Sequence, residues 1–83
     1  MHVGSEISVV LHAPELHLWT PPGSSDPAVA VVVGAGVDQE GAAHATVNAV
    51  RPGTAVLSAV AQPRDGAPDP RAVPWRLVVT VVA

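Results

Sequence analysis

The chain has 83 residues, which is enough for one small domain spanning residues 1–83 and not for two. It has no cysteine and a net charge of −3 without a basic cluster, which excludes disulfide scaffolds and thiol chemistry and argues against a nucleic-acid partner. No apolar run reaches the roughly 18 residues of a membrane span, so no membrane insertion is expected. Because the hydrophobic residues are mostly valine and alanine, strands are favoured over helices.

The first predicted elements are two short strands. Residues 6–11 alternate apolar and polar positions, which is typical of a half-buried strand, and Pro14 ends it. Residues 16–20 form a second short run in which His17 and Trp19 share one face and two leucines share the other. We expect Trp19, one of only two aromatic side chains, to lie in the core.

The middle of the chain predicts two further strands. After the turn residues 21–27, the continuous apolar run 28–33 predicts a strand that is covered on both faces. The glycine-containing stretch 34–42 predicts a loop, and residues 43–50 alternate again as a strand. A helix over residues 37–50 is the alternative, although its β-branched residues, its internal glycine and its period near two favour the strand.

Two strands and a long loop complete the chain. A proline–glycine turn at residues 51–54 precedes a strand over 55–61, a proline-rich loop over 62–74 and a last strand over 75–82. Six or so strands at turn spacings of about 8–12 residues predict an all-β sandwich.

Three of the predicted loops are expected at one end of this sandwich. If successive strands run antiparallel, loops 12–15, 34–42 and 62–74 meet there, while turns 21–27 and 51–53 lie at the other end. Long loops on a rigid scaffold commonly carry binding residues. Valine-rich edge strands also predict self-association, since unpaired strand edges invite pairing.

Two stretches resemble the bacterial immunoglobulin-like (BIg) domains. Trp19-Thr20 is followed, after a Pro-Pro-Gly insertion, by a Ser-Ser-Asp-Pro turn and a Val-Ala-Val strand over 24–31. Residues 49–59, Ala-Val-Arg-Pro-Gly-Thr-Ala-Val-Leu-Ser-Ala, are similar to the hairpin of that family. The resemblance covers roughly residues 3–83 and implies an immunoglobulin-like antiparallel β-sandwich of six to seven strands, in a bacterial protein that is secreted or lies at the cell surface as part of a longer precursor.

The layout is also similar to the chagasin-type inhibitors of papain-like cysteine proteases, which are immunoglobulin-like as well. The shared features are the first strand at residues 3–7, the glycine-rich stretch 34–36 and the Pro74-Trp75 pair. Only Pro14 matches the inhibitors' first loop motif, and Gln62-Pro63-Arg64 stands where their Arg-Pro-Trp motif is expected. The resemblance therefore supports the fold more than the inhibition.

Motifs that would indicate nucleotide binding, metal binding or catalysis are weak. Gly34-Ala35-Gly36 follows an apolar strand, as in dinucleotide-binding proteins, but Gln39 stands where the third glycine belongs, so a loop is the simpler interpretation. His12 and His17 flank Glu15 without a second pair of metal ligands. No nucleophile motif is present, and the chain is expected to be no enzyme and to need no cofactor or metal.

The sequence thus predicts a non-enzymatic interaction, adhesion or spacer module that binds a protein partner through its loop cluster, with chagasin-like protease inhibition as the alternative. Trp75 is expected either in the core or as a binding anchor at the end of its loop. The candidate partner-binding residues are His12, Pro14, Glu15, Gly34, Gly36, Pro63, Arg64, Asp65 and Trp75.

Overall fold

The computed structural model describes residues 1–83, and every regular element in it is a β-strand. The structure contains no helix of the length and apolarity that crossing a membrane requires. The strands, in chain order, are β1 (Glu6–Leu11), β2 (His17–Trp19), β3 (Gly23–Ser24), β4 (Ala30–Val37), β5 (Ala43–Ala49), β6 (Gly53–Pro63) and β7 (Val73–Val81).

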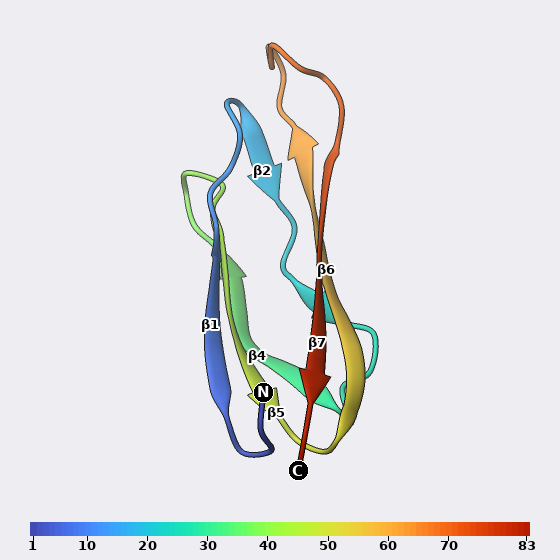
Figure 1. The fold of residues 1–83 in the computed structure, drawn as a ribbon. Helices are drawn as coiled ribbons and strands as arrows, with labels where there is room; N and C mark the ends of the chain where they lie inside the picture. Colours follow the sequence, from blue (N-terminus) through green and yellow to red (C-terminus); the bar gives the residue numbers. More distant parts are fainter.

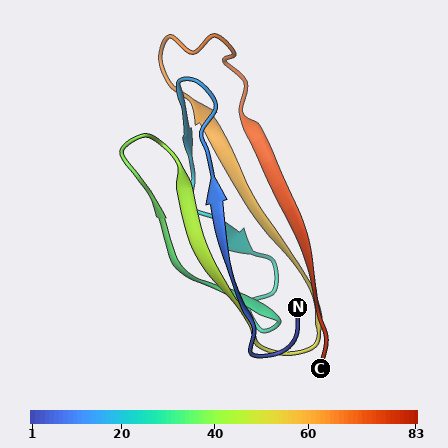
Figure 2. The same ribbon diagram turned by 60° about the vertical axis from the view of Figure 1, so that its left-hand side comes forward.

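The seven strands form two antiparallel sheets that pack face to face (Figures 1 and 2). The first sheet has the order β1–β5–β4, and the second has β6 at its centre, with β7 along one edge and β2 followed by β3 along the other. If β1 corresponds to the second strand of an immunoglobulin domain, these orders are its B-E-D and C-F-G sheets. The predicted immunoglobulin-like β-sandwich is therefore confirmed.

Strands β2 and β3 are two parts of one interrupted strand. Pro21 and Pro22 lack the N–H groups that a ladder needs and break the pairing with β6. Thr20 keeps the contact with β6 in this gap, because its Oγ1 donates to the Val60 carbonyl and accepts from the Val60 N–H, each at 3.1 Å. Beyond β3, the Val56 N–H donates to Ser25 Oγ at 2.9 Å.

Strand β4 contains a β-bulge that the sequence presented as a loop. Val33 pairs with Thr46 and Gly36 with His44, so two residues of β4 lie opposite one residue of β5. Gly34 supplies the left-handed backbone of the bulge, with φ at 63°. The expected loop over 34–42 is therefore wrong in its first part, because the strand continues to Val37.

The expectation that the apolar run 28–33 is covered on both faces is also wrong. Ala30 and Val32 pair with the inward-facing residues Ala49 and Val47, but Val33 pairs with Thr46 on the outer face and is exposed. In a sandwich of two sheets, each sheet is covered on one face only, so no strand of it has both faces buried.

The alternation predicted for the last three strands is confirmed. Every second residue of β5 is buried from Ala43 to Ala49, which excludes the alternative helix over 37–50. In β6 the odd-numbered residues from Ala55 to Ala61 are buried, and they pair with the inward-facing positions of β7. β6 and β7 extend further than predicted, so the loop between them has residues 64–72 instead of 62–74.

The core has two parts, built mainly from alanine and valine. Near the termini, Leu57 and Val47 are its largest fully buried side chains. Near the loops, Trp19 packs on Ala43, Ala59 and Ala61, as expected for a core tryptophan. Trp75 is half-buried and packs against both parts.

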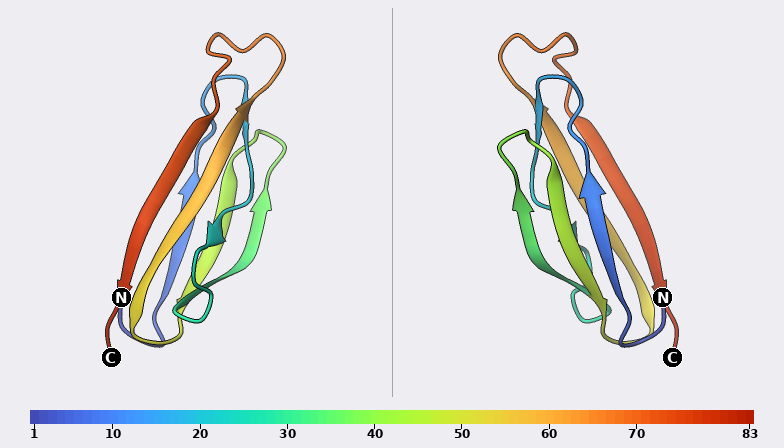
Figure 3. Two further views of the ribbon diagram at one scale, coloured as in Figure 1. Left: turned by 90° about the vertical axis from the view of Figure 1, so that its right-hand side faces the viewer. Right: turned by 90° about the vertical axis from the view of Figure 1, so that its left-hand side faces the viewer.

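The two long sides of the sandwich differ. On one side β3 lies beside β4, whereas no such approach joins β1 to β7 on the other side (Figure 3). Both chain termini lie at the bottom of this second side, where His2 forms a parallel bridge with Val82 and the Val3 N–H donates to the Val82 carbonyl.

Candidate functional site

Three loops meet at the end of the sandwich opposite the termini (Figure 1). They join β1 to β2 (residues 12–16), β4 to β5 (38–42) and β6 to β7 (64–72), and we call them together the loop end. The antiparallel order of the strands brings them together, as the sequence predicted.

Backbone contacts fix the three loops to one another. The Arg64 N–H donates to the Leu16 carbonyl at 2.7 Å, and the Trp19 N–H donates to the Gly41 carbonyl at 3.0 Å. Gly41 has φ at 90°, and a Cβ placed on it would lie 2.6 Å from the His17 carbonyl oxygen. The loop over 38–42 can therefore approach β2 only because residue 41 is glycine.

Leu16 has the one strained backbone of the loop end. It is the only residue other than glycine with a positive φ, at 55°, a conformation that is unfavourable for a leucine. Its side chain is nevertheless 45% exposed, so no burial in the core accounts for the strain. Residues held in such conformations cluster at functional sites, which makes Leu16 a candidate binding residue.

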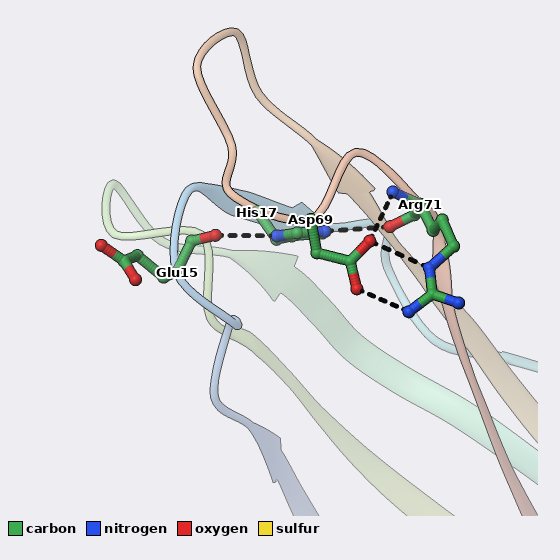
Figure 4. Close-up of polar contacts among 4 residues, drawn as sticks. All are labelled: Glu15, His17, Asp69 and Arg71. Atoms are coloured by element: carbon green, nitrogen blue, oxygen red, sulfur yellow. Dashed lines mark hydrogen bonds and ion pairs between the residues drawn. The ribbon is translucent and has the colours of Figure 1, made fainter.

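His17 is buried beneath these loops, with 3% of its surface exposed (Figure 4). Its Nδ1 lies 2.8 Å from the Glu15 carbonyl oxygen, and its Nε2 lies 3.0 Å from the Arg71 carbonyl oxygen. A carbonyl only accepts hydrogen bonds, and a neutral imidazole has a single N–H. Only the imidazolium can donate to both carbonyls, so the protonated side chain links loop 12–16 to loop 64–72.

Asp69 and Arg71 form an ion pair beside this imidazole. Arg71 Nε and Nη2 donate to the two carboxylate oxygens of Asp69, each at 3.0 Å, and the Arg71 N–H donates to Asp69 Oδ1 at 3.1 Å. These bonds lower the pKa of Asp69 to about 2. The pair is solvent-exposed, so it contributes little to stability by itself, but its bonds hold residue 71, whose carbonyl accepts from His17.

The protonation of His17 predicts a pH-dependent stability. The Glu15 and Arg71 carbonyls, together with the negative charge of Asp69, raise the pKa of His17 above its ordinary value. The Glu15 carboxylate points away from the ring (Figure 4). A raised pKa in the folded state stabilises the fold below the unfolded value of about 6.5, and this stabilisation is lost as the pH rises through the folded value.

We therefore expect the melting temperature to fall as the pH is raised from about 6 through the raised pKa of His17. NMR titration of the His17 imidazole, beside a series of melting curves, measures both quantities. In His17→Gln this part of the pH dependence should disappear, whereas replacing the exposed His12 should leave it in place. An unchanged pH dependence in His17→Gln would contradict the assignment.

The predicted site residues are divided between the loop end and the strands. His12, Pro14 and Glu15 lie in the first loop, and Arg64 and Asp65 in the third. Pro63 is the last residue of β6, so it borders the loop end.

Three other predicted residues lie within strands. Gly34 and Gly36 belong to the bulged part of β4, where the ring of His44 would lie 3.0 Å from a Cβ on Gly36. Trp75 lies in β7, where its packing against the core makes it a structural residue as well as a candidate contact.

Sequence reasoning missed several residues that form the loop end. The alternation in residues 16–20 indicated that His17 shares the inward face of Trp19, but nothing in the pattern indicated its carbonyl partners, of which Arg71 lies 54 residues away. An Asp-Pro-Arg sequence at 69–71 is a local turn signal that could have suggested the ion pair. Leu16 gave no signal, because leucine is not a residue that normally marks a positive φ.

The loop end offers surface for contact and few groups for chemistry. No three histidine, aspartate or glutamate side chains lie close enough to hold a metal ion, and the surface has no pocket. Apolar and proline side chains are interspersed with charged ones from Glu15, Arg64, Asp65 and Asp69. A surface that mixes apolar and polar groups is compatible with a protein–protein contact, because such interfaces are on the whole about as apolar as the rest of a protein surface.

Comparison with protein-family models, with curated proteins and with solved structures gives no match. The resemblances to BIg domains and to chagasin-type inhibitors therefore stay predictions.

Proposed function

We propose that the chain is a non-enzymatic interaction module that binds a partner protein through the loop end, in a bacterial protein that is secreted or lies at the cell surface. The observation that carries this proposal is Leu16, whose side chain is exposed although its backbone is strained, and whose carbonyl accepts a hydrogen bond from the Arg64 N–H of the third loop. Such strain is difficult to explain for a loop that only connects two strands.

The rigidity of the loop end also supports binding. The Leu16 carbonyl is bonded to the Arg64 N–H, and the His17 N–H donates to the Pro14 carbonyl at 3.0 Å. Prolines at 14, 63, 68 and 70 restrict the backbone further. A surface that is ordered before binding loses less conformational entropy when a partner arrives.

The position of the loops gives a third argument, by analogy of fold. Loops 12–16 and 64–72 correspond to the B–C and F–G loops of an immunoglobulin sandwich, which contact antigen in antibody variable domains. Fold analogy by itself does not establish a function, so the proposal rests on Leu16 and its surroundings.

Replacing Leu16 with asparagine tests the proposal, because asparagine tolerates a positive φ and lacks the apolar side chain. Leu16→Asn should keep or slightly raise the stability and weaken partner binding by at least about tenfold, as expected for the loss of an interface anchor. Val50→Asn, at the opposite end, is the matched control for an exposed apolar residue. Circular dichroism establishes that each variant is folded.

Two binding measurements with the intact domain test which kind of partner the loop end binds. Tight-binding titration of papain and of a cathepsin-like protease tests the chagasin-like form of the proposal, and adsorption of the domain to bacterial cells tests the adhesion form. Binding or inhibition that is lost in Leu16→Asn and kept in Val50→Asn supports the loop end as the binding surface. If Leu16→Asn binds as tightly as the wild type, the proposed surface is wrong.

A further inference from the structure

The four edges of the two sheets are not equally protected against pairing with another strand. β4 is kinked by its glycine bulge, and the edge formed by β2 and β3 is interrupted by Pro21 and Pro22. Bulges and prolines are the usual means by which proteins block strand addition. β1 has neither, and β7 has only Pro74, near its beginning.

The two unprotected edges lie on the same side of the sandwich, which we call the open side (Figure 3). Residues Met1–Val3 cover only its lower end, where the Met1 ammonium donates to the Thr80 carbonyl and the Val82 N–H donates to the Met1 carbonyl. Above this point, β1 from Ile7 to Leu11 and the upper part of β7 have no strand beside them on this side.

Inward-facing side chains along the open side are incompletely buried. Ile7, Val9 and Leu11 of β1 are half-buried, and Leu77 of β7 is 38% exposed although it pairs with the fully buried Leu57. On the outer faces of the same strands, Val10 is 59% and Val78 is 60% exposed, more than any other large hydrophobic residue. Both edges therefore present apolar surface that an added strand would cover.

The directions of the two strands indicate what that strand is. β1 and β7 run in opposite directions and belong to different layers (Figures 1 and 3). Rotation of one copy by 180° about an axis parallel to the strands therefore places β1 of each copy antiparallel beside β7 of the other copy. Glu6 is the only charged residue of β1 and Arg76 the only one of β7, so neither edge carries the run of charged side chains that blocks strand addition.

We propose that two copies of this chain pair through their open sides, β1 to β7 in both directions, as a closed dimer with twofold symmetry. Each pairing extends one sheet of one copy into a sheet of the other by main-chain hydrogen bonds. Both loop ends then point the same way. The proposal does not depend on what the loop end binds, so either one can fail while the other stands.

Sedimentation equilibrium of the whole chain measures the association. The wild type should show twice the monomer mass, and Val10→Lys/Val78→Lys should weaken the dimer by at least about tenfold, because it places like charges on the two paired edges. Val10→Glu/Val78→Lys, with opposite charges, should keep the dimer, which distinguishes repulsion from misfolding. Val33→Lys, on the outer face of the protected edge strand β4, should have no effect.

Cross-linking tests the pairing of the edges directly, because the chain has no cysteine of its own. A short bis-maleimide should join a Val10→Cys copy to a Val78→Cys copy in a mixture, and should join neither variant to itself efficiently. A monomer mass that persists at about 1 mM would overturn the proposal, since even weak pairing is populated at that concentration. Cross-links within each single variant would equally overturn it, in favour of like-edge pairing.

Discussion

Replacing Trp19 with alanine is expected to destabilise the domain by about 3–5 kcal/mol, the range for truncation of a buried aromatic side chain. Trp19 packs on alanines at 43, 59 and 61, whose methyl groups are too short to fill the space left by an indole. At about 0.05–0.15 kcal/mol per residue, a chain of 83 residues has a total stability of roughly 4–12 kcal/mol. At the lower end of this range the variant should be unfolded at 37 °C, whereas at the upper end it should keep more than half of its stability.

Urea denaturation followed by far-ultraviolet circular dichroism measures this loss. Trp19→Phe is the informative control, because it keeps an aromatic ring and loses the second ring of the indole together with the hydrogen bond from Trp19 Nε1 to the His12 carbonyl, which is 2.9 Å long. It should cost markedly less than Trp19→Ala. Trp75→Ala, at a half-buried position, should fall between the two; if it costs as much as Trp19→Ala, the core is not centred on Trp19.

Gly41→Ala is expected to cost about 2–5 kcal/mol, from two separate causes. A left-handed backbone costs an alanine roughly 1–2 kcal/mol relative to glycine, and crowding a packed site costs about 1–3 kcal/mol more. The crowding is specific: the new Cβ would lie 2.6 Å from the His17 carbonyl oxygen and 3.2 Å from the Leu18 Cα. Neither atom belongs to a movable side chain, so the loop over 38–42 would have to separate from β2.

Gly66→Ala separates the two causes. Gly66 also has a positive φ, at 80°, but a Cβ there meets nothing within 4 Å. It should show only the conformational cost of roughly 1–2 kcal/mol. Melting curves of the two variants give the difference, and amide hydrogen exchange at Trp19, whose N–H donates to Gly41, reports whether the loop has separated. Equal costs for the two substitutions would show that the contact with His17 is not rigid.

The strands were predictable because their burial follows a period of two. The inward positions of β1, β5, β6 and β7 are those that the alternation indicated. The continuous apolar run at 28–33 has no such period, and there the number of covered faces was predicted wrongly. The glycines at 34 and 36 mark loops and bulges equally well, and only the pairing of β4 with β5 decides between them.

The loop end was predictable in outline and not in detail. Alternating strand direction is enough to place three loops at one end, but the residues that fix them interact over long sequence separations. His17 meets Arg71, and Leu16 meets Arg64, through main-chain carbonyls that every residue has and that leave no mark in the sequence. The strain at Leu16 likewise follows from how the loops close, and not from the identity of the residue.

The position of the two termini decides how this domain can be attached to something else. Val3 and Val82 are joined by a main-chain hydrogen bond at one end of a molecule that is 47 Å long and no more than 20 Å wide, and the loops lie at the other end. A carrier protein, a bead or a surface coupled to either terminus would therefore hold the loops at its outer tip, facing solvent. The closeness of the termini also makes circular permutation feasible, with a short linker joining the present ends and new ends opened elsewhere.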